Sequence, residues 1–208
     1  MDEAESKSAE VIARNIDLLE NAVDFALTKM DDALFEAVQE VMNRKKIELR
    51  WEGAFGSNFE DAQWVAPSEW RAQDEEVDGS YHLSCYLGLE GDATTNVAYF
   101  IGGNERFAYI GIGSDTLKKK RMYKALAITL ADDLKLLVER GFMFDEKAFE
   151  FKIPIRVGCD AMAKGFADED LTAALAPIGA AIDLISQNLD VFKRIKEAVQ
   201  RETEGLSP

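Results

Sequence analysis

Residues 81–112 read YHLSCYLGLEGDATTNVAYFIGGNERFAYIGI, and the prediction of a sheet starts from this stretch. Three runs rich in apolar, β-branched and aromatic residues, 81–89, 95–101 and 107–112, are separated by the turn sequences EGD and GGN. Glycine and asparagine tolerate the positive φ that tight hairpins require, so these turns favour consecutive antiparallel strands. The sequence therefore predicts an antiparallel meander through the middle of the chain.

Two further strands are predicted upstream of the meander. Ile47, Leu49 and Trp51 alternate with charged residues, which is the period of a half-buried strand. Another strand is predicted in residues 63–70, where Pro67 would confine it to a sheet edge or a bulge because proline has no amide hydrogen to donate.

The chain before the strands has the periodicity of a helix. Within residues 8–46 the first apolar positions recur every three or four residues, on one stripe: Ile12, Ile16, Leu19, Val23, Ala26 and Met30. Asp31 could then cap a second helix, because its carboxylate can accept hydrogen bonds from first-turn amides. A kinked single helix is the alternative.

A long helix and one more strand are predicted after the meander. Residues 113–116 supply capping-type side chains at the start of this helix, and Gly141 is placed to end it in a left-handed conformation. Residues 149–156 alternate between apolar and other side chains, which predicts a strand. This strand is expected at a sheet edge because it contains Pro154.

Residues 168–203 are predicted to form a pair of C-terminal helices, with a kink or a restart at Pro177. The predicted order is a helix pair, a meander of four to six strands, a long helix, a strand and a second helix pair, which is typical of an α+β fold. We expect one α+β domain over residues 1–208. It would consist of a helical segment (8–46), the sheet with the central helix (47–157), and C-terminal helices packed on one sheet face.

The charge of the chain limits the partners that it can bind. Its 208 residues include 39 acidic and 24 basic side chains, a formal charge of −15. Nucleic acid and anionic membranes repel such a chain unless a local basic patch overrides the average. The absence of a ~20-residue apolar run and of an export signal, with only Cys85 and Cys159 present, leads us to expect a cytoplasmic protein without a membrane span.

The acidic segment 60–78 is the predicted surface for a protein partner, and a basic partner would suit its charge. Trp64 and Trp70 lie on either side of Pro67 and are expected to be partly exposed, where they could contribute to an interface. The predicted partner-binding residues are Glu69, Asp74, Glu75, Glu76, Asp78, Trp64 and Trp70. The opposing interpretation is a solvated acidic run. A homodimer, through a terminal helix or the strand with Pro154, is left open.

A basic run at 118–124 follows a short glycine loop and predicts an anion site. Free amides at a helix start attract anions, so a phosphate-bearing ligand or a nucleic-acid backbone would suit this place. The predicted anion-binding residues are Ser114, Thr116, Lys119, Lys120 and Lys124. The alternative is that these lysines balance acidic neighbours through surface ion pairs.

Residues for nucleophilic catalysis or metal binding are scarce. His82 is the only histidine, so a Ser-His-Asp or Cys-His mechanism would have to use it. Cys85 lies three residues away on the same predicted strand, and side chains at odd spacing face opposite sides. Nothing in the sequence pairs His82 with Cys159, and one histidine without paired cysteines disfavours zinc. The sequence therefore predicts no catalytic residue, no metal ligand and no cofactor.

The order of elements invites comparison with nucleases of the PD-(D/E)xK type, whose core runs helix, three strands, helix, strand. Their metal-binding strand carries an acid, one spacer and a lysine, whereas the predicted strands 81–89 and 95–101 contain no lysine. Residues 133–135 have the right letters but lie in a predicted helix. The leading hypothesis is a non-catalytic binding or regulatory protein (adaptor, chaperone-like or inhibitor-like). A divergent metal-dependent hydrolase is the enzymatic alternative.

Overall fold

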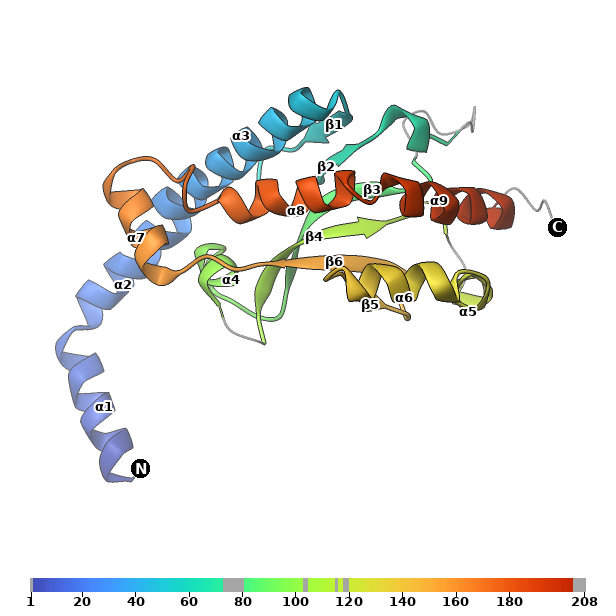
Figure 1. The fold of residues 1–208 in the computed structure, drawn as a ribbon. Helices are drawn as coiled ribbons and strands as arrows, with labels where there is room; N and C mark the ends of the chain where they lie inside the picture. Colours follow the sequence, from blue (N-terminus) through green and yellow to red (C-terminus); the bar gives the residue numbers. More distant parts are fainter. Residues whose placement is uncertain (1, 73–80, 103–104, 115, 118–119, 204–208) are drawn as a thin grey trace.

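The computed structural model describes residues 2–72, 81–102, 105–114, 116–117 and 120–203, without the side chain of Lys120. Six strands form one antiparallel sheet in the order β1-β2-β3-β4-β6-β5. Helix α8 packs against β4 and β6, α9 continues in nearly the same direction, and α3 lies beside α8 (Figure 1). The predicted α+β fold, with an antiparallel sheet and helices against one face, is confirmed.

The six strands are short, and β3 and β4 pair along their whole length, from Ser84 opposite Gly113 to Glu90 opposite Phe107. Their bounds are β1 Glu52–Phe55, β2 Gln63–Ala66, β3 Ser84–Glu90, β4 Phe107–Gly113, β5 Met143–Asp145 and β6 Glu150–Ile155.

The helices include one π-helical turn, η1, and one 3₁₀ turn, η2. Their bounds are α1 Glu3–Arg14, α2 Ile16–Phe25, η1 Ala26–Met30, α3 Asp31–Leu49, η2 Ser68–Trp70, α4 Val97–Ile101, α5 Lys120–Thr129, α6 Ala131–Glu139, α7 Cys159–Ala167, α8 Ala176–Ser186 and α9 Leu189–Thr203. None of the described helices has the length and apolar character that crossing a membrane requires.

The core lies between the sheet and the helices. Alternate residues of the central strands point into it, and Cys85, Ile110, Ile112 and Phe151 are each at most 1% exposed. Helix α8 contacts both β4 and β6 and supplies further buried side chains: Ile178, Ala181, Ile182 and Ile185. Each large apolar side chain buried in this way stabilises the fold by about 1.5–3 kcal/mol.

The strand predicted around Ile47, Leu49 and Trp51 is wrong. Helix α3 continues to Leu49 and ends at Arg50 in the left-handed conformation (φ 57°). Lys45 supports this last part of the helix, because its ammonium group pairs with Glu48 on the same helix and with Asp183 on α8, at 3.0 and 2.7 Å. The first strand starts at Glu52.

The strand predicted at 95–101 is also wrong, because residues 97–101 form helix α4. The carboxylate of Asp31 accepts hydrogen bonds from the backbone amides of Asn96 and Val97, at 3.0 and 3.2 Å, and from the Asn96 side chain at 3.0 Å. A contact 65 residues away in sequence therefore satisfies the start of this helix. Asp31 does cap a helix, but not its own: α3 has no side-chain cap.

The break that the sequence placed near Asp31 lies elsewhere. Helices α1 and α2 are separated at Asn15, and the π-helical turn η1 then joins α2 to α3. Residues 8–46 are therefore helical as predicted, with a kink near the N-terminus. Along this segment α1 and α2 project away from the sheet (Figure 1).

The long central helix is two helices, α5 and α6, which meet at Leu130. Gly141 follows α6 with φ 98°, so its predicted left-handed conformation is confirmed. Neither proline marks an edge strand as predicted. Pro67 follows β2, which lies between β1 and β3, and Pro154 lies on β6 between β4 and β5. Because β5 pairs only with residues 150–152 of β6, proline is tolerated beyond the end of β5.

The C-terminal helices differ from the prediction at their start. Residues 168–175 form turns, whereas helix α7, which was not predicted, precedes them at 159–167. Pro177 lies in the first turn of α8, where its missing amide hydrogen costs nothing. It is therefore a restart of the helix, one of the two outcomes that the sequence allowed.

Candidate functional site

The candidate site is on the outer face of the sheet, the face turned away from the helices. Because side chains alternate along a strand, the neighbours of the core residues point outwards. The outward residues of the three central strands are Ser84, Tyr86, Gly88 and Glu90 on β3, Phe107, Tyr109, Gly111 and Gly113 on β4, and Glu150, Lys152 and Pro154 on β6. This face combines aromatic rings, glycines and charged groups.

Two tyrosines lie opposite two glycines on the neighbouring strand. Tyr86 pairs with Gly111, and Gly88 pairs with Tyr109. A Cβ atom on Gly111 would lie 2.7 Å from Cζ of Tyr86, and one on Gly88 would lie 2.3 Å from Cζ of Tyr109. The two glycines therefore leave the space in which the tyrosine rings lie over the sheet, with their centroids 6.3 Å apart.

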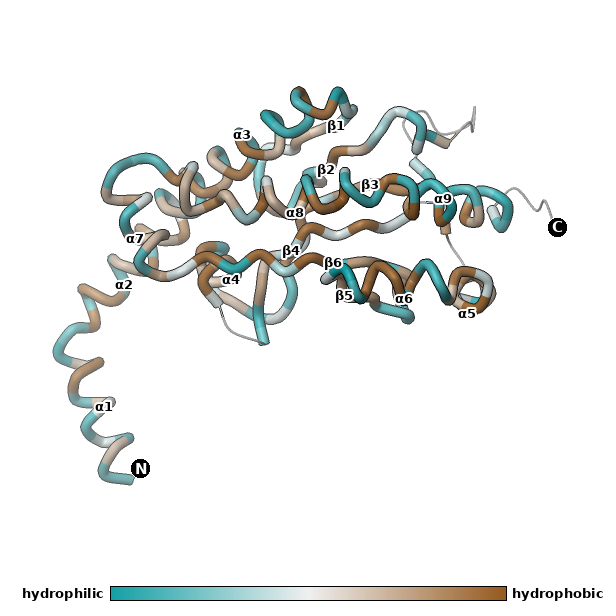
Figure 2. The backbone as a smooth tube through the Cα atoms, viewed as in Figure 1, coloured by the Kyte–Doolittle hydropathy of each residue, from teal (hydrophilic) through white to brown (hydrophobic). Residues whose placement is uncertain are grey.

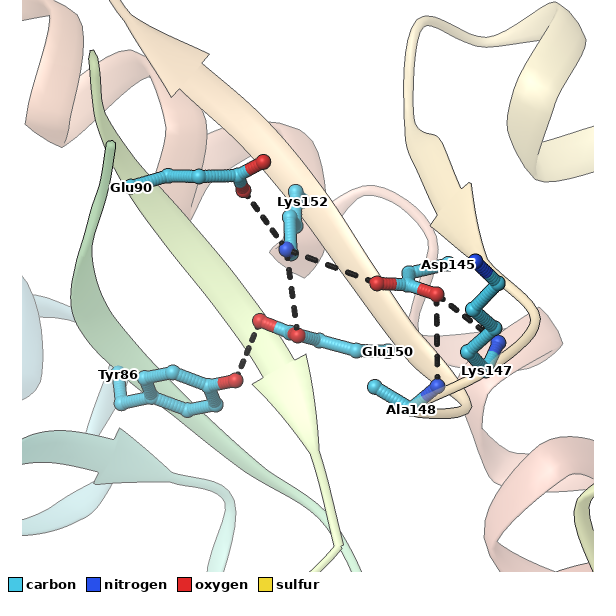
Figure 3. A network of polar contacts seen from close by, with 7 residues as sticks. All are labelled: Tyr86, Glu90, Asp145, Lys147, Ala148, Glu150 and Lys152. Carbon is cyan, nitrogen blue, oxygen red and sulfur yellow. Dashed lines mark hydrogen bonds and ion pairs between the residues drawn. The ribbon is translucent and has the colours of Figure 1, made fainter. Parts of the chain in front are cut away.

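Lys152 is the centre of a charged network on this face (Figure 3). Its ammonium nitrogen lies 2.8 Å from a carboxylate oxygen of Glu90, 3.6 Å from one of Glu150 and 3.9 Å from one of Asp145. It also lies 4.8 Å from the centre of the Tyr109 ring, over its face. Three carboxylates thus surround one ammonium group, so the network is negative overall.

Glu150 and Asp145 are each held by a second partner. The Tyr86 hydroxyl donates a hydrogen bond to Oε1 of Glu150, leaving Oε2 nearest to Lys152. Oδ1 of Asp145 accepts from the backbone amides of Lys147 and Ala148 in the β5–β6 turn, at 2.9 and 3.4 Å (Figure 3). Glu150 and Asp145 therefore each accept a hydrogen bond from a group other than Lys152.

Burial and charge shift the pKa values of this network. Burial raises the pKa of Tyr86, and the hydrogen bond to Glu150 raises it further. Burial and the charge of Glu150 raise the pKa of Tyr109 to about 12. Burial alone would lower the pKa of Lys152, but the hydrogen bond to Glu90 and the charge of Glu150 raise it above its ordinary value. Lys152 is therefore a fixed cation at neutral pH.

Beside this network the outer face is hollowed by a cavity of about 460 Å³. Its lining residues come from β2, β3, β4 and the β5–β6 hairpin with adjacent loops: Ala62, Gln63, Trp64, Ser84, Tyr86, Leu87, Gly113, Ser114, Ala148 and Glu150. The lining thus includes the aromatic rings of Trp64 and Tyr86 and the carboxylate of Glu150. This combination suits a cationic group with an apolar stem.

We expect the free energy of unfolding to fall as the pH rises above about 10. Tyr86 and Tyr109 have raised pKa values in the folded protein, so above the ordinary pKa of tyrosine the unfolded chain binds fewer protons. Each proton held only by the folded state then lowers the stability by about 1.4 kcal/mol per pH unit. Urea unfolding at a series of pH values measures this loss.

Tyr86→Phe provides the control for this titration. The variant lacks one of the titrating groups, so its stability should fall with pH less steeply than that of the parent, by about one proton. Equal slopes in the two proteins, or a parent whose stability is flat above the ordinary pKa of tyrosine, would contradict the assignment.

The predicted partner surface is only partly described. Glu69 is exposed on η2, and Trp64 is half-buried on the outer face, where its ring lies 4.6 Å from that of Tyr81. The expected exposure of Trp70 is wrong: this side chain is 1% exposed, because it packs between Trp51 and Phe192 in the core. The other predicted acids, Asp74, Glu75, Glu76 and Asp78, lie outside the described residues.

At the predicted anion site, the helix begins later in the sequence than predicted. Helix α5 begins at Lys120, so Ser114 and Thr116 lie before the helix, where their hydroxyl oxygens are 3.0 Å apart and hydrogen-bonded to each other. Lys124 is exposed on α5. Lys119 and the side chain of Lys120 lie outside the described part of the chain, so binding of an anion there stays a prediction.

The histidine and the cysteines have different surroundings. His82 is buried just before β3, and its backbone amide donates to the carbonyl of Trp70 at 2.8 Å. Cys85 is in the core, where burial raises the pKa of its thiol, so it is unsuited to act as a thiolate nucleophile. Cys159 is exposed at the first residue of α7.

Sequence reasoning overlooked the acid, spacer and lysine on β6, Glu150-Phe151-Lys152. The acid and the lysine do share one face of a strand, as in the nuclease pattern. Here, however, the carboxylates face the ammonium group of Lys152. Within the described ranges, no group of three or more histidine, cysteine, aspartate or glutamate side chains is placed to hold a metal ion.

No family model, curated protein or solved structure matches this chain. Function is therefore inferred from the geometry of the outer face.

Proposed function

We propose that this is a non-catalytic binding protein that takes a basic segment of a protein partner on the outer face of its sheet. The observation that supports this proposal is the acidic and aromatic composition of the cavity and the adjacent network. A lysine or arginine side chain would lay its apolar stem against Trp64 and Tyr86 and bring its charge towards Glu150.

Lys152 is an internal example of such binding. It already places an ammonium group between carboxylates and over the ring of Tyr109, at 4.8 Å from the ring centre. Glu90 and Asp145 keep 47% and 39% of their side chains exposed, so they can also attract a second cation. The overall charge of −15 would speed the approach of a basic partner and repel an acidic one.

Calorimetric titration of the full chain with a short lysine- and arginine-rich peptide tests this proposal, with an acidic peptide of the same length for comparison. We expect the basic peptide alone to bind at low salt. Replacing Glu90 and Glu150 together by glutamine keeps their size but removes two charges, and it should weaken binding by about tenfold or more.

The matched control replaces Glu3 and Glu10 by glutamine, which makes the same chemical change on α1. This control variant should bind nearly as tightly as the parent. If the two double variants weaken binding equally, the overall charge attracts the peptide and the outer face is not the site. If the parent does not bind the basic peptide, the proposed function is wrong.

A further inference from the structure

The N-terminal arm, residues 3–30, has an apolar stripe that the rest of the described chain does not cover. Neither α1, α2 nor η1 contains a buried residue. Brown segments recur along these helices between teal ones (Figure 2). The large apolar side chains exposed on the arm are Val11, Ile12, Ile16, Leu18, Leu19, Val23, Phe25 and Leu27. This concentration on one projecting element indicates a surface for another chain.

Part of this stripe has the spacing of a coiled coil. Ile12, Ile16, Leu19, Val23 and Ala26 follow one another at steps of four, three, four and three residues. This is a heptad repeat in which Ile16 and Val23 take the a positions, with Ile12, Leu19 and Ala26 at d. β-Branched residues at a with leucine at d favour a parallel pair of helices.

The charges beside this seam are compatible with a second copy of the same helix. In a parallel pair, each g position faces the e position five residues further along the other helix. These pairs are Asn15 with Glu20 and Ala22 with Leu27, so no like charges face each other. The acids at the b positions, Glu10, Asp17 and Asp24, point away from the seam. Two copies of a chain of charge −15 can therefore associate along this seam without repulsion between facing side chains.

The length of the seam is limited on both sides by the structure. The π-helical turn η1 changes the phase of the helix, and Met30, which would be the next a position, packs against the core of the same molecule. The break at Asn15 separates Ile12 from the remaining positions. The seam is therefore centred on α2, where Leu19, Val23 and Leu27 border a shallow groove.

We infer that two copies of this chain pair through α2, in parallel, with Ile16, Leu19 and Val23 of each copy against the same residues of the other. The contact is short, so pairing should depend on concentration. Such a dimer would carry two copies of the outer sheet face. The inference does not depend on what the outer face binds.

Leu18 and Leu19 offer a matched test, because they are adjacent leucines of which only Leu19 lies on the seam. Leu18 is 67% exposed and Leu19 is 42% exposed. Sedimentation equilibrium of the full chain, over a roughly hundredfold range of concentration, should show the parent rising towards twice the mass of 23.2 kDa. Leu19→Glu should remain a monomer, whereas Leu18→Glu should associate like the parent.

Each other outcome overturns the inference. A parent that stays monomeric rules out pairing, and two variants that both associate place the contact elsewhere on the molecule. If both variants are monomers, the contact is a general apolar one without this register. Circular dichroism should show that both variants stay folded, since α2 adds no buried residue to the core. Peptide titration of Leu19→Glu separates this result from the proposed function, because a monomer should still bind the basic peptide.

Direction is tested by an Ile16→Cys substitution in a Cys159→Ser background. In a parallel pair the introduced thiols face each other, so mild oxidation should yield a covalent dimer. An antiparallel pair would keep them apart, and absence of the dimer would contradict the proposed direction.

Discussion

Replacing Lys152 by methionine should lower the free energy of unfolding by about 3 kcal/mol, because it leaves buried carboxylate charge without its cation. The side chains of Lys152 and Glu150 are only 12% and 10% exposed, so water compensates little. Glu90 and Asp145 are more exposed and can turn towards solvent, which limits the loss. Urea unfolding at neutral pH measures this difference. Acidification, which neutralises the carboxylates, should reduce it.

Two further variants make this prediction specific to the network. Adding Glu150→Gln to Lys152→Met removes the buried carboxylate charge together with its cation, and the amide oxygen can still accept the hydrogen bond from Tyr86. The double variant should therefore be more stable than Lys152→Met alone. Lys135→Met removes an exposed lysine that lies 3.9 Å from Glu139, and it should cost about 0.5 kcal/mol or less. If Lys152→Met were as harmless as Lys135→Met, the network would not stabilise the sheet.

The sequence predicts the elements in which apolar residues gather on one side. Residues 107–112 alternate because one side of β4 faces the core, and the apolar residues of 8–30 recur every three or four positions along one side of a helical segment, although most of that side is exposed. The two wrong strand predictions have a common cause, because contacts with residues far away in the sequence stabilise these segments as helices. Asp31 fixes α4, and Asp183 supports the end of α3 through Lys45, and neither pairing can be read from the local sequence.

The candidate site is less predictable because it depends on register between strands. The alternation of tyrosine and glycine in SCYLGLE and FAYIGIG is visible in the sequence, but the pairing of Tyr86 with Gly111 depends on the alignment of β3 with β4. Glu90, Asp145 and Lys152 come from three strands, of which β5 was not predicted. Among the predicted site residues that the structure describes, only Trp64 and Ser114 also line the cavity.

Trp70→Ala should destabilise the protein by about 4 kcal/mol, because it opens a large cavity in the core. Its ring centre lies 5.9 Å from that of Phe192 on α9 and 6.3 Å from that of Trp51, so the cavity would lie between η2, the residue before β1 and the C-terminal helix. Trp64→Ala is the natural comparison, since its ring is half-buried on the outer face and its loss should cost about 2 kcal/mol.

The two tryptophans should also differ in their effect on binding, and this difference separates stability from function. Under conditions in which both variants are folded, Trp64→Ala should lose affinity for the basic peptide, since Trp64 lines the cavity. Trp70→Ala should retain it, because the Trp70 ring packs against Trp51 and Phe192 and does not line the cavity. Urea unfolding measures the stability of each variant, and peptide titration measures its affinity. A Trp70 variant that is nearly as stable as the parent, or a Trp64 variant that binds as the parent does, would contradict the assignment of these residues to core and site.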